Sequence, residues 1–190
     1  YYAREGRDSV ALLERWADQG NGGAKMVSAW RSWKRVKDRP KPPTKAVWIT
    51  RKYIERCAEY LKSQEEPTLA WFKSRAVGEA LQEEGIDVCW NDDPTPGKTH
   101  ALSIPIHHKG RNYQPWSHNF IIELPSSGST WEQMVGRTHR QGQSADTVHV
   151  TICRDTWAQR NALKKAKEDA RYIQDSTGSM QKLCYADWTY

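Results

Sequence analysis

Residues 68–90, TLAWFKSRAVGEALQEEGIDVCW, decide the fold class. Their first five residues, TLAWF, form an apolar run of strand length, and IDVCW at 86–90 is a second such run. Between them, residues 74–84 repeat apolar side chains at helical spacing, and Gly85 is a typical residue just after a helix end. A strand, a helix and a strand of these lengths predict a βαβ unit with parallel strands.

The alternation of strands and helices continues toward the C-terminus. ALSIPI at 101–106 and FIIEL at 120–124 predict apolar strands, and TVHVTI at 147–152 alternates with period two. The fold class that follows is α/β, a mainly parallel sheet flanked by helices, with ligands approaching at the carboxyl ends of the strands. A long helix is expected from about Asp155, and one face of it carries Leu163, Ala166, Ala170 and Ile173.

The N-terminal part of the chain is polar and basic. Residues 25–39 follow a turn-forming Gly-Asn-Gly-Gly run and predict a helix with Trp30 and Trp33 on one face. We expect these indoles to pack against the domain rather than to stack on bases. Thr44 is a suitable N-cap for a second helix, whose apolar positions are Val47, Ile54, Cys57 and Leu61.

These patterns predict three parts of the chain. Residues 1–43 are expected to form a basic helical extension or linker, 44–175 an α/β lobe, and 176–190 a C-terminal tail. The chain does not begin with methionine, so we expect it to be a fragment of a longer protein.

Composition limits the class of protein. A chain of 190 residues with 37% hydrophobic content can bury a core, and no apolar run approaches the roughly 20 residues that span a membrane. The net charge of +6 is compatible with a polyanion such as nucleic acid but does not establish one. The cysteines show no C-x-x-C spacing, which predicts reduced thiols in an intracellular protein and no metal site. They are Cys57, Cys89, Cys153 and Cys184.

A polar stripe follows the FIIEL strand, in TWEQMVGRTHRQGQ at 130–143. If this segment is one helix that begins after an N-cap at Thr130 and stops at Gly142, Gln133 occupies the position of a capping-box partner. At about 100° per residue, the stripe also falls on one face, within about 100° of arc. Its members are Gln133, Gly136, Arg137 and Arg140.

Such a stripe is costly as pure structure. Glycine inside a helix costs about 1 kcal/mol relative to alanine, and neighbouring guanidinium groups repel. A phosphate group would offset both costs, because guanidinium binds phosphate oxygens through paired hydrogen bonds and Gly136 lets a partner approach closely. For two helical arginines alone, a solvated face is the simpler interpretation.

The surrounding sequence favours function. QMVGRTHRQGQ at 133–143 resembles motif VI of superfamily-2 helicases and translocases, most closely that of Swi/Snf-type ATPases and related phage and bacterial helicases. HHKGRNYQPWSHNFIIELP at 107–125 is similar to motif V, and TLAWFKSRAVGEAL at 68–81 to motif IV, which opens the second RecA-like lobe. The resemblance covers about residues 44–156 and implies a RecA-like sheet.

This resemblance implies roles for the stripe. Arg140 would be an arginine finger, Arg137 would orient or share the γ-phosphate, and Gln133 would contact nucleotide or the attacking water. ATP and Mg would be held mainly by an N-terminal RecA-like lobe of the same polypeptide. Further nucleotide-binding candidates, three of them in the G-x-N-x-Q positions of motif V, are Gly136, Gly110, Asn112 and Gln114.

In the same family, motifs IV and V touch the nucleic-acid backbone, and we expect DNA rather than RNA as the partner. A loop lysine or arginine is as often merely solvated. Trp116 follows motif V in what reads as an exposed loop, and base stacking and core packing are equally open for it. The nucleic-acid candidates are Lys73, Ser74, Arg75, Lys109, Arg111 and Trp116.

Two other motifs are misleading. Gly-Lys-Thr at 97–99 lacks the glycine that a phosphate loop needs at position 92, and a strand rather than a helix is expected after it. With no acidic magnesium motif either, the chain alone should not hydrolyse ATP. The adjacent His107 and His108 cannot readily share one metal ion, so phosphate contact, backbone contact or no function remain for them.

Two hypotheses of different class follow. The first is the second motor lobe of a nucleic-acid-dependent ATPase, in the cytoplasm of a bacterium or a phage-infected host and away from membranes. The second is a degenerate, inactive lobe retained as a nucleic-acid or protein-binding scaffold, with the basic 24–41 region as its contact surface. The joint presence of Gln133, Arg137 and Arg140 favours the first.

Overall fold

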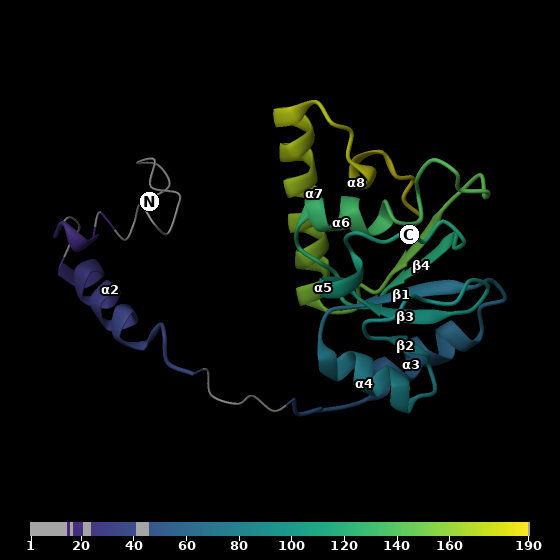
Figure 1. The fold of residues 1–190 in the computed structure, drawn as a ribbon, viewed down its shortest axis with the longest axis horizontal. Coiled ribbons are helices and arrows are strands. Elements are labelled where there is room, and N and C mark those ends of the chain that lie inside the picture. Colours follow the sequence, from purple (N-terminus) through teal and green to yellow (C-terminus); the bar gives the residue numbers. More distant parts are fainter. Residues whose placement is uncertain (1–14, 16, 21–23, 41–45, 190) are drawn as a thin grey trace. The chain divides into compact units, whose positions relative to one another are not determined.

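The computed structural model describes residues 15, 17–20, 24–40 and 46–189, in two compact units, 1–46 and 47–190 (Figure 1). In the first unit, the helix predicted at 25–39 is present as α2 (Ala24–Val36). Its Trp30 and Trp33 rings stack on each other with centroids 4.8 Å apart.

A five-stranded parallel sheet forms the centre of the second unit. Its order is β2-β3-β1-β4-β5, and every pairing of neighbouring strands is parallel. The central position of β1 separates two strands on one side from two on the other, as in doubly wound sheets. The predicted RecA-like α/β class is therefore confirmed. The strands are β1 (Thr68–Phe72), β2 (Val88–Cys89), β3 (His100–Ser103), β4 (His118–Ile121) and β5 (His149–Ile152).

Helices cover both faces of this sheet. Figure 1 shows α3 (Lys52–Lys62) and α4 (Arg75–Glu83) on one side, with α6 (Gly128–Val135) and α7 (Trp157–Thr177) on the other. All five residues of β1 are buried, because a central parallel strand is covered on both faces. Alternate side chains therefore enter different cores: Leu69 and Trp71 face α6 and α7, and Ala70 and Phe72 face α3 and α4.

Three local predictions are wrong at element ends. The strand predicted at 101–106 stops at Ser103, and α5 (Ile104–His107) follows, because Pro105 lacks an N–H for the sheet but fits the first turn of a helix. The second helix begins at Lys52, so Val47 precedes it with 81% of its surface exposed. Thr44, its predicted cap, lies outside the described residues. Trp157, which is typical of a core position by pattern, is 73% exposed at the first position of α7.

The C-terminal residues pack into the core on the α6 and α7 side of the sheet. A capping box between Thr156 and Gln159 starts α7, and Gly178 ends it in the left-handed conformation (φ 71°). The short α8 (Lys182–Tyr185) then packs beside α6: the Lys182 N–H donates to the Glu132 carboxylate at 2.7 Å, and Leu183 is buried. Within the described part of the chain, no helix combines the length and the apolar character needed to cross a bilayer.

Candidate functional site

The helix that carries the motif VI-like sequence starts earlier than predicted. Its N-cap is Ser127, and the Gly128 N–H donates to the Asp169 carboxylate of α7 at 2.7 Å. A Cβ at Gly128 would lie 2.5 Å from the Ala170 backbone nitrogen, so glycine is required where α7 passes. Thr130 lies inside the helix, and the predicted cap at Thr130 with Gln133 as its partner is wrong, because a distant carboxylate already satisfies the helix start.

The same helix also ends earlier than predicted. It stops at Val135, and Gly136–Thr138 form a turn. The prediction of one helix that continues to Gly142 is therefore wrong, and Arg137 and Arg140 follow the helix rather than belong to it. A Cβ at Gly136 would meet the Glu132 carbonyl oxygen at 2.6 Å, so the turn itself requires this glycine.

Arg137 is bound within the protein. Its Nε donates to the carbonyl oxygens of His108 (3.1 Å) and Gln133 (3.2 Å), and its Nη1 donates to the Arg111 carbonyl (3.0 Å). Gln133 contributes one of the last carbonyls of α6, which a guanidinium satisfies well. This half-buried side chain thus joins the end of α6 to the motif V-like loop.

Arg140 has the opposite environment. It is exposed, and no hydrogen bond or ion pair of its guanidinium occurs within the described residues. Its backbone is nevertheless held, since its carbonyl accepts the Gln143 N–H at 3.0 Å and Gly142 completes the turn with φ 91°. The structure therefore presents one unpaired cation on an ordered turn.

Gln133 contributes a buried polar atom. Its Oε1 is shielded from solvent and has no hydrogen-bond partner among the described residues. Leaving a buried acceptor unsatisfied costs about 1–3 kcal/mol.

The motif V-like loop lies directly against the motif VI-like turn. The Tyr113 N–H donates to the Arg137 carbonyl at 2.9 Å, and the Gln114 side chain donates to the Gln141 carbonyl. Asn112 in turn donates to Gln114 Oε1 at 2.7 Å, and Gly110 adopts φ 74°, which favours glycine. Asn112 and Gln114 thus brace the turn, a role that the resemblance alone did not assign.

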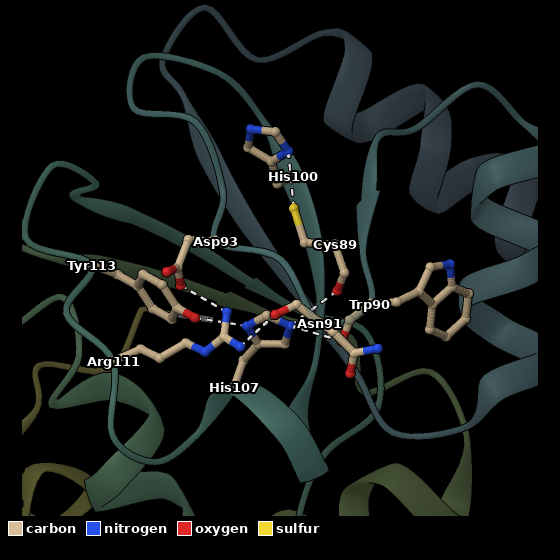
Figure 2. Close-up of polar contacts among 8 residues, drawn as sticks. All are labelled: Cys89, Trp90, Asn91, Asp93, His100, His107, Arg111 and Tyr113. Carbon is tan, nitrogen blue, oxygen red and sulfur yellow. Dashed lines mark hydrogen bonds and ion pairs between the residues drawn. The ribbon is translucent and has the colours of Figure 1, made fainter.

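A polar cluster anchors the other end of this loop to the segment after β2 (Figure 2). Arg111 donates to Asp93 Oδ1 at 2.7 Å and to the Asn91 carbonyl at 2.5 Å. The buried His107 lies beside it, with Nδ1 2.7 Å from the Tyr113 hydroxyl and Nε2 3.0 Å from the Cys89 carbonyl. Arg111 is therefore held by the protein itself and is a weak nucleic-acid candidate.

The partners of His107 fix its tautomer. Nε2 faces only carbonyl oxygens, of Cys89 and Trp90, so it carries the proton, and Nδ1 accepts from the Tyr113 hydroxyl. Burial, and then the Arg111 charge, lower the pKa of His107 below its usual range. His107 is therefore neutral and joins the loop to the backbone carbonyls of Cys89 and Trp90.

Cys89 and His100 resemble a nucleophile and its base, but the chemistry does not fit. Cys89 Sγ and Asp87 Oδ2 approach the same ring nitrogen of His100, Nδ1, at 3.4 and 3.1 Å. Burial, followed by the charge of Asp87, raises the pKa of the Cys89 thiol to about 11. A protonated, buried thiol is a poor nucleophile, so this pair is structural.

The nucleic-acid candidates divide by environment. Lys73 and Lys109 are exposed, and Arg75 is exposed beside Glu79 at 2.8 Å. The backbone N–H and the hydroxyl of Ser74 both donate to Glu123, at 2.6 and 2.5 Å, so these donors are already occupied.

Trp116 is buried rather than exposed. Only 2% of its surface is accessible, and its indole Nε1 donates to the Lys98 carbonyl at 2.8 Å. It packs against Tyr113 within the core on the α6 and α7 side of the sheet. The candidate role in base stacking is therefore wrong, because the ring faces are covered.

The buried side-chain hydrogen bonds that join the turn to the sheet were not predicted from the sequence. Trp71 Nε1 donates to Asn119 Oδ1 (2.9 Å), and Asn119 Nδ2 donates to Thr138 Oγ1 (3.0 Å), all fully or nearly fully buried. This relay fixes the turn to β1 and β4. Asn119 lies just before the apolar run predicted at 120–124, and the structure includes it in β4.

The Gly-Lys-Thr segment is not a phosphate loop. As predicted, a strand, β3, follows it rather than a helix, and Thr99 Oγ1 accepts the Thr68 N–H at 3.1 Å. Among the described residues, no group of three or more His, Cys, Asp or Glu side chains could hold a metal ion.

Comparison with known proteins adds no assignment: no family model matches the chain, and no curated protein matches it at the threshold applied.

Proposed function

We propose that this chain is the second motor lobe of a nucleic-acid-dependent ATPase, a helicase or DNA translocase. In this proposal Arg140 is an arginine finger that reaches the γ-phosphate of ATP on a first RecA-like lobe. The observation that carries it is the contrast of an exposed, unpaired Arg140 guanidinium with a turn that is bound to the rest of the lobe.

Preorganisation is the physical reason. An arginine that meets developing charge accelerates phosphoryl transfer by about 10³ to 10⁵, provided that its backbone does not have to reorganise. Arg137 within the turn, Gln114 from the motif V-like loop and Asn119 from β4 hold the backbone on both sides of Arg140 in place. Arg137 thus acts as a positioning residue, and Arg140 as the residue that would touch the nucleotide.

The chain's own groups fit a phosphate partner. Arg140 supplies positive charge, and the unsatisfied Gln133 Oε1 can accept a hydrogen bond from the attacking water or from the partner lobe. When bound, ATP supplies the transferable phosphoryl group and Mg²⁺ neutralises part of its charge. We assign Mg²⁺ to the partner lobe.

Nucleic acid is the proposed activator, and DNA the proposed track. After Trp116 and Arg111 are set aside, Lys73, Arg75 and Lys109 remain as exposed cations for its phosphates. Their contacts would be insensitive to base sequence and would weaken with salt.

The test is steady-state ATP hydrolysis by the polypeptide that contains both lobes, with no DNA, single-stranded DNA or double-stranded DNA. We expect DNA to stimulate turnover, and Arg140→Ala to lower kcat by about 10³-fold or more without lowering the melting temperature. The matched control is Arg171→Ala, which removes an exposed arginine that lies on α7, outside the motif-like segments. This variant should hydrolyse ATP as wild type does. Arg140→Lys keeps the positive charge but lacks the paired N–H donors of the planar guanidinium. Its kcat should therefore lie between those of Arg140→Ala and wild type.

Two results would defeat the proposal. One is hydrolysis that is indifferent to Arg140. The other is the complete absence of hydrolysis although the purified protein is folded and binds DNA, which would support the scaffold alternative.

A further inference from the structure

We infer that Cys57 and Cys153 form a reversible redox site, at which hydrogen peroxide converts two thiols into one disulfide. Their sulfur atoms lie 4.0 Å apart although 96 positions separate the residues in sequence. Cys57 belongs to α3, and Cys153 directly follows β5. The inference is independent of the proposed function, because neither cysteine belongs to the motif-like segments.

The elements that carry the two sulfurs are well held. The Cys153 N–H donates to the Ile121 carbonyl at 3.1 Å. Tyr53, one helical turn before Cys57, donates its hydroxyl to the Ile122 carbonyl at 2.6 Å and accepts from Gln159 Nε2 at 2.7 Å. Bonded sulfurs lie about 2.0 Å apart, so the two sulfurs must approach by about 2 Å from their present separation of 4.0 Å.

The two thiols are not equivalent. Cys57 is 3% exposed, whereas Cys153 is half-buried and so is the one that a small oxidant reaches first. The contact with the Cys57 sulfur lowers the pKa of Cys153, although burial opposes it, and the same contact, together with burial, raises the pKa of Cys57. Because the thiolate is the nucleophile, Cys153 attacks first and Cys57 resolves.

The chemistry balances in two steps. The Cys153 thiolate attacks one peroxide oxygen, the O–O bond breaks, and hydroxide leaves, so the sulfur becomes a sulfenic acid. The Cys57 sulfur then loses its proton and attacks Cys153 Sγ, and the S–O bond breaks with loss of water. The sum is two thiols and one hydrogen peroxide giving one disulfide and two waters.

The other two cysteines serve as internal controls. Cys184 is exposed and so is open to peroxide, but no contact to a second thiol occurs for it within the described residues. Cys89 is buried, and its sulfur faces His100 rather than a thiol. Neither should enter an intramolecular disulfide.

The experiment treats the purified, reduced protein with increasing hydrogen peroxide, blocks remaining thiols under denaturing conditions, and identifies linked peptides by non-reducing mass spectrometry. We expect one intramolecular Cys57–Cys153 link that dithiothreitol reverses, and a higher melting temperature of the oxidised protein, because the link constrains the unfolded chain. In Cys57→Ser, the link and the gain in melting temperature should disappear, and a sulfenic-acid probe should instead label Cys153.

Peroxide that oxidises Cys184 but leaves both Cys57 and Cys153 free for alkylation would overturn the inference. A link found only between different molecules, and lost on dilution, would overturn it as well. The wild-type measurement decides the matter even if a serine variant does not fold.

Discussion

Two neighbouring segments of the second unit carry the same kind of residue in opposite environments. In the loop 107–117, Arg111, Tyr113 and Trp116 are bound to other parts of the protein by side-chain hydrogen bonds or by burial. In the segment 139–142, which follows the Gly136–Thr138 turn, Arg140 is exposed and unpaired within the described structure. The sequence alone predicts ligand contact for both segments, whereas in the structure Arg111 and Trp116 are held within the protein and Lys109 and Arg140 are exposed.

Arg137 lies just before the second segment and binds backbone carbonyls of the first. The cost of placing two arginines near each other suggested a phosphate ligand for both. Arg137 has three carbonyl partners, at 3.0–3.2 Å, and therefore needs no ligand to explain it. Arg140, by contrast, is exposed and has no hydrogen bond or ion pair of its guanidinium within the described residues.

The largest effect on stability is expected from Trp116→Ala. It removes a buried indole and leaves a cavity, which should lower the free energy of unfolding by about 3–5 kcal/mol. Trp157→Ala, which truncates an indole that is 73% exposed, is the control and should change it by less than about 0.5 kcal/mol. Chemical denaturation measures both. Equal losses would show that the loop is not packed as described.

A smaller loss is expected from Arg137→Ala. Three backbone carbonyls lose their donor, and the free energy of unfolding should fall by about 2 kcal/mol. Arg140→Ala is the matched control and should change stability by less than about 0.5 kcal/mol, because its guanidinium is exposed. If the denaturant midpoints of the two variants fall equally, the hydrogen bonds of Arg137 do not stabilise the fold as described.

The mildest prediction concerns acid. Above pH 6.5, His107 is neutral in both folded and unfolded chains, so its burial costs nothing through protonation. Its folded pKa is lowered by burial, so as pH falls below 6.5 the unfolded chain takes up a proton that the folded chain does not. Stability therefore declines until the folded pKa is reached, with a slope of at most about 1.4 kcal/mol per pH unit.

The measurement for this prediction is the free energy of unfolding from pH 8 to pH 5. The slope should be shallower in His107→Gln, whatever that variant's stability at neutral pH. An unchanged slope in His107→Gln would mean that another group governs the acid response. Asp93 and Arg111 are the charges that act on His107 in the folded state.

The sequence alone was sufficient where structure is local. β1, α4 with Gly85 at its end, and the long α7 follow from apolar periodicity and from residues within one helical turn of each other. The parallel sheet follows from their alternation. The motif-like spacing of Gln133, Arg137 and Arg140 is likewise a property of the sequence, but the roles proposed for them have yet to be tested.

Only the tertiary structure decided which of these polar groups are free. Asp169 caps α6 from 41 positions away, the His108 carbonyl binds Arg137 across 29, and the Lys98 carbonyl binds the Trp116 indole across 18. Helical periodicity and capping patterns describe residues a few positions apart, so they cannot report such partners. For that reason the sequence determined the fold class, whereas the packing of distant segments determined that Arg137 is held by backbone carbonyls and that Arg140 stays exposed.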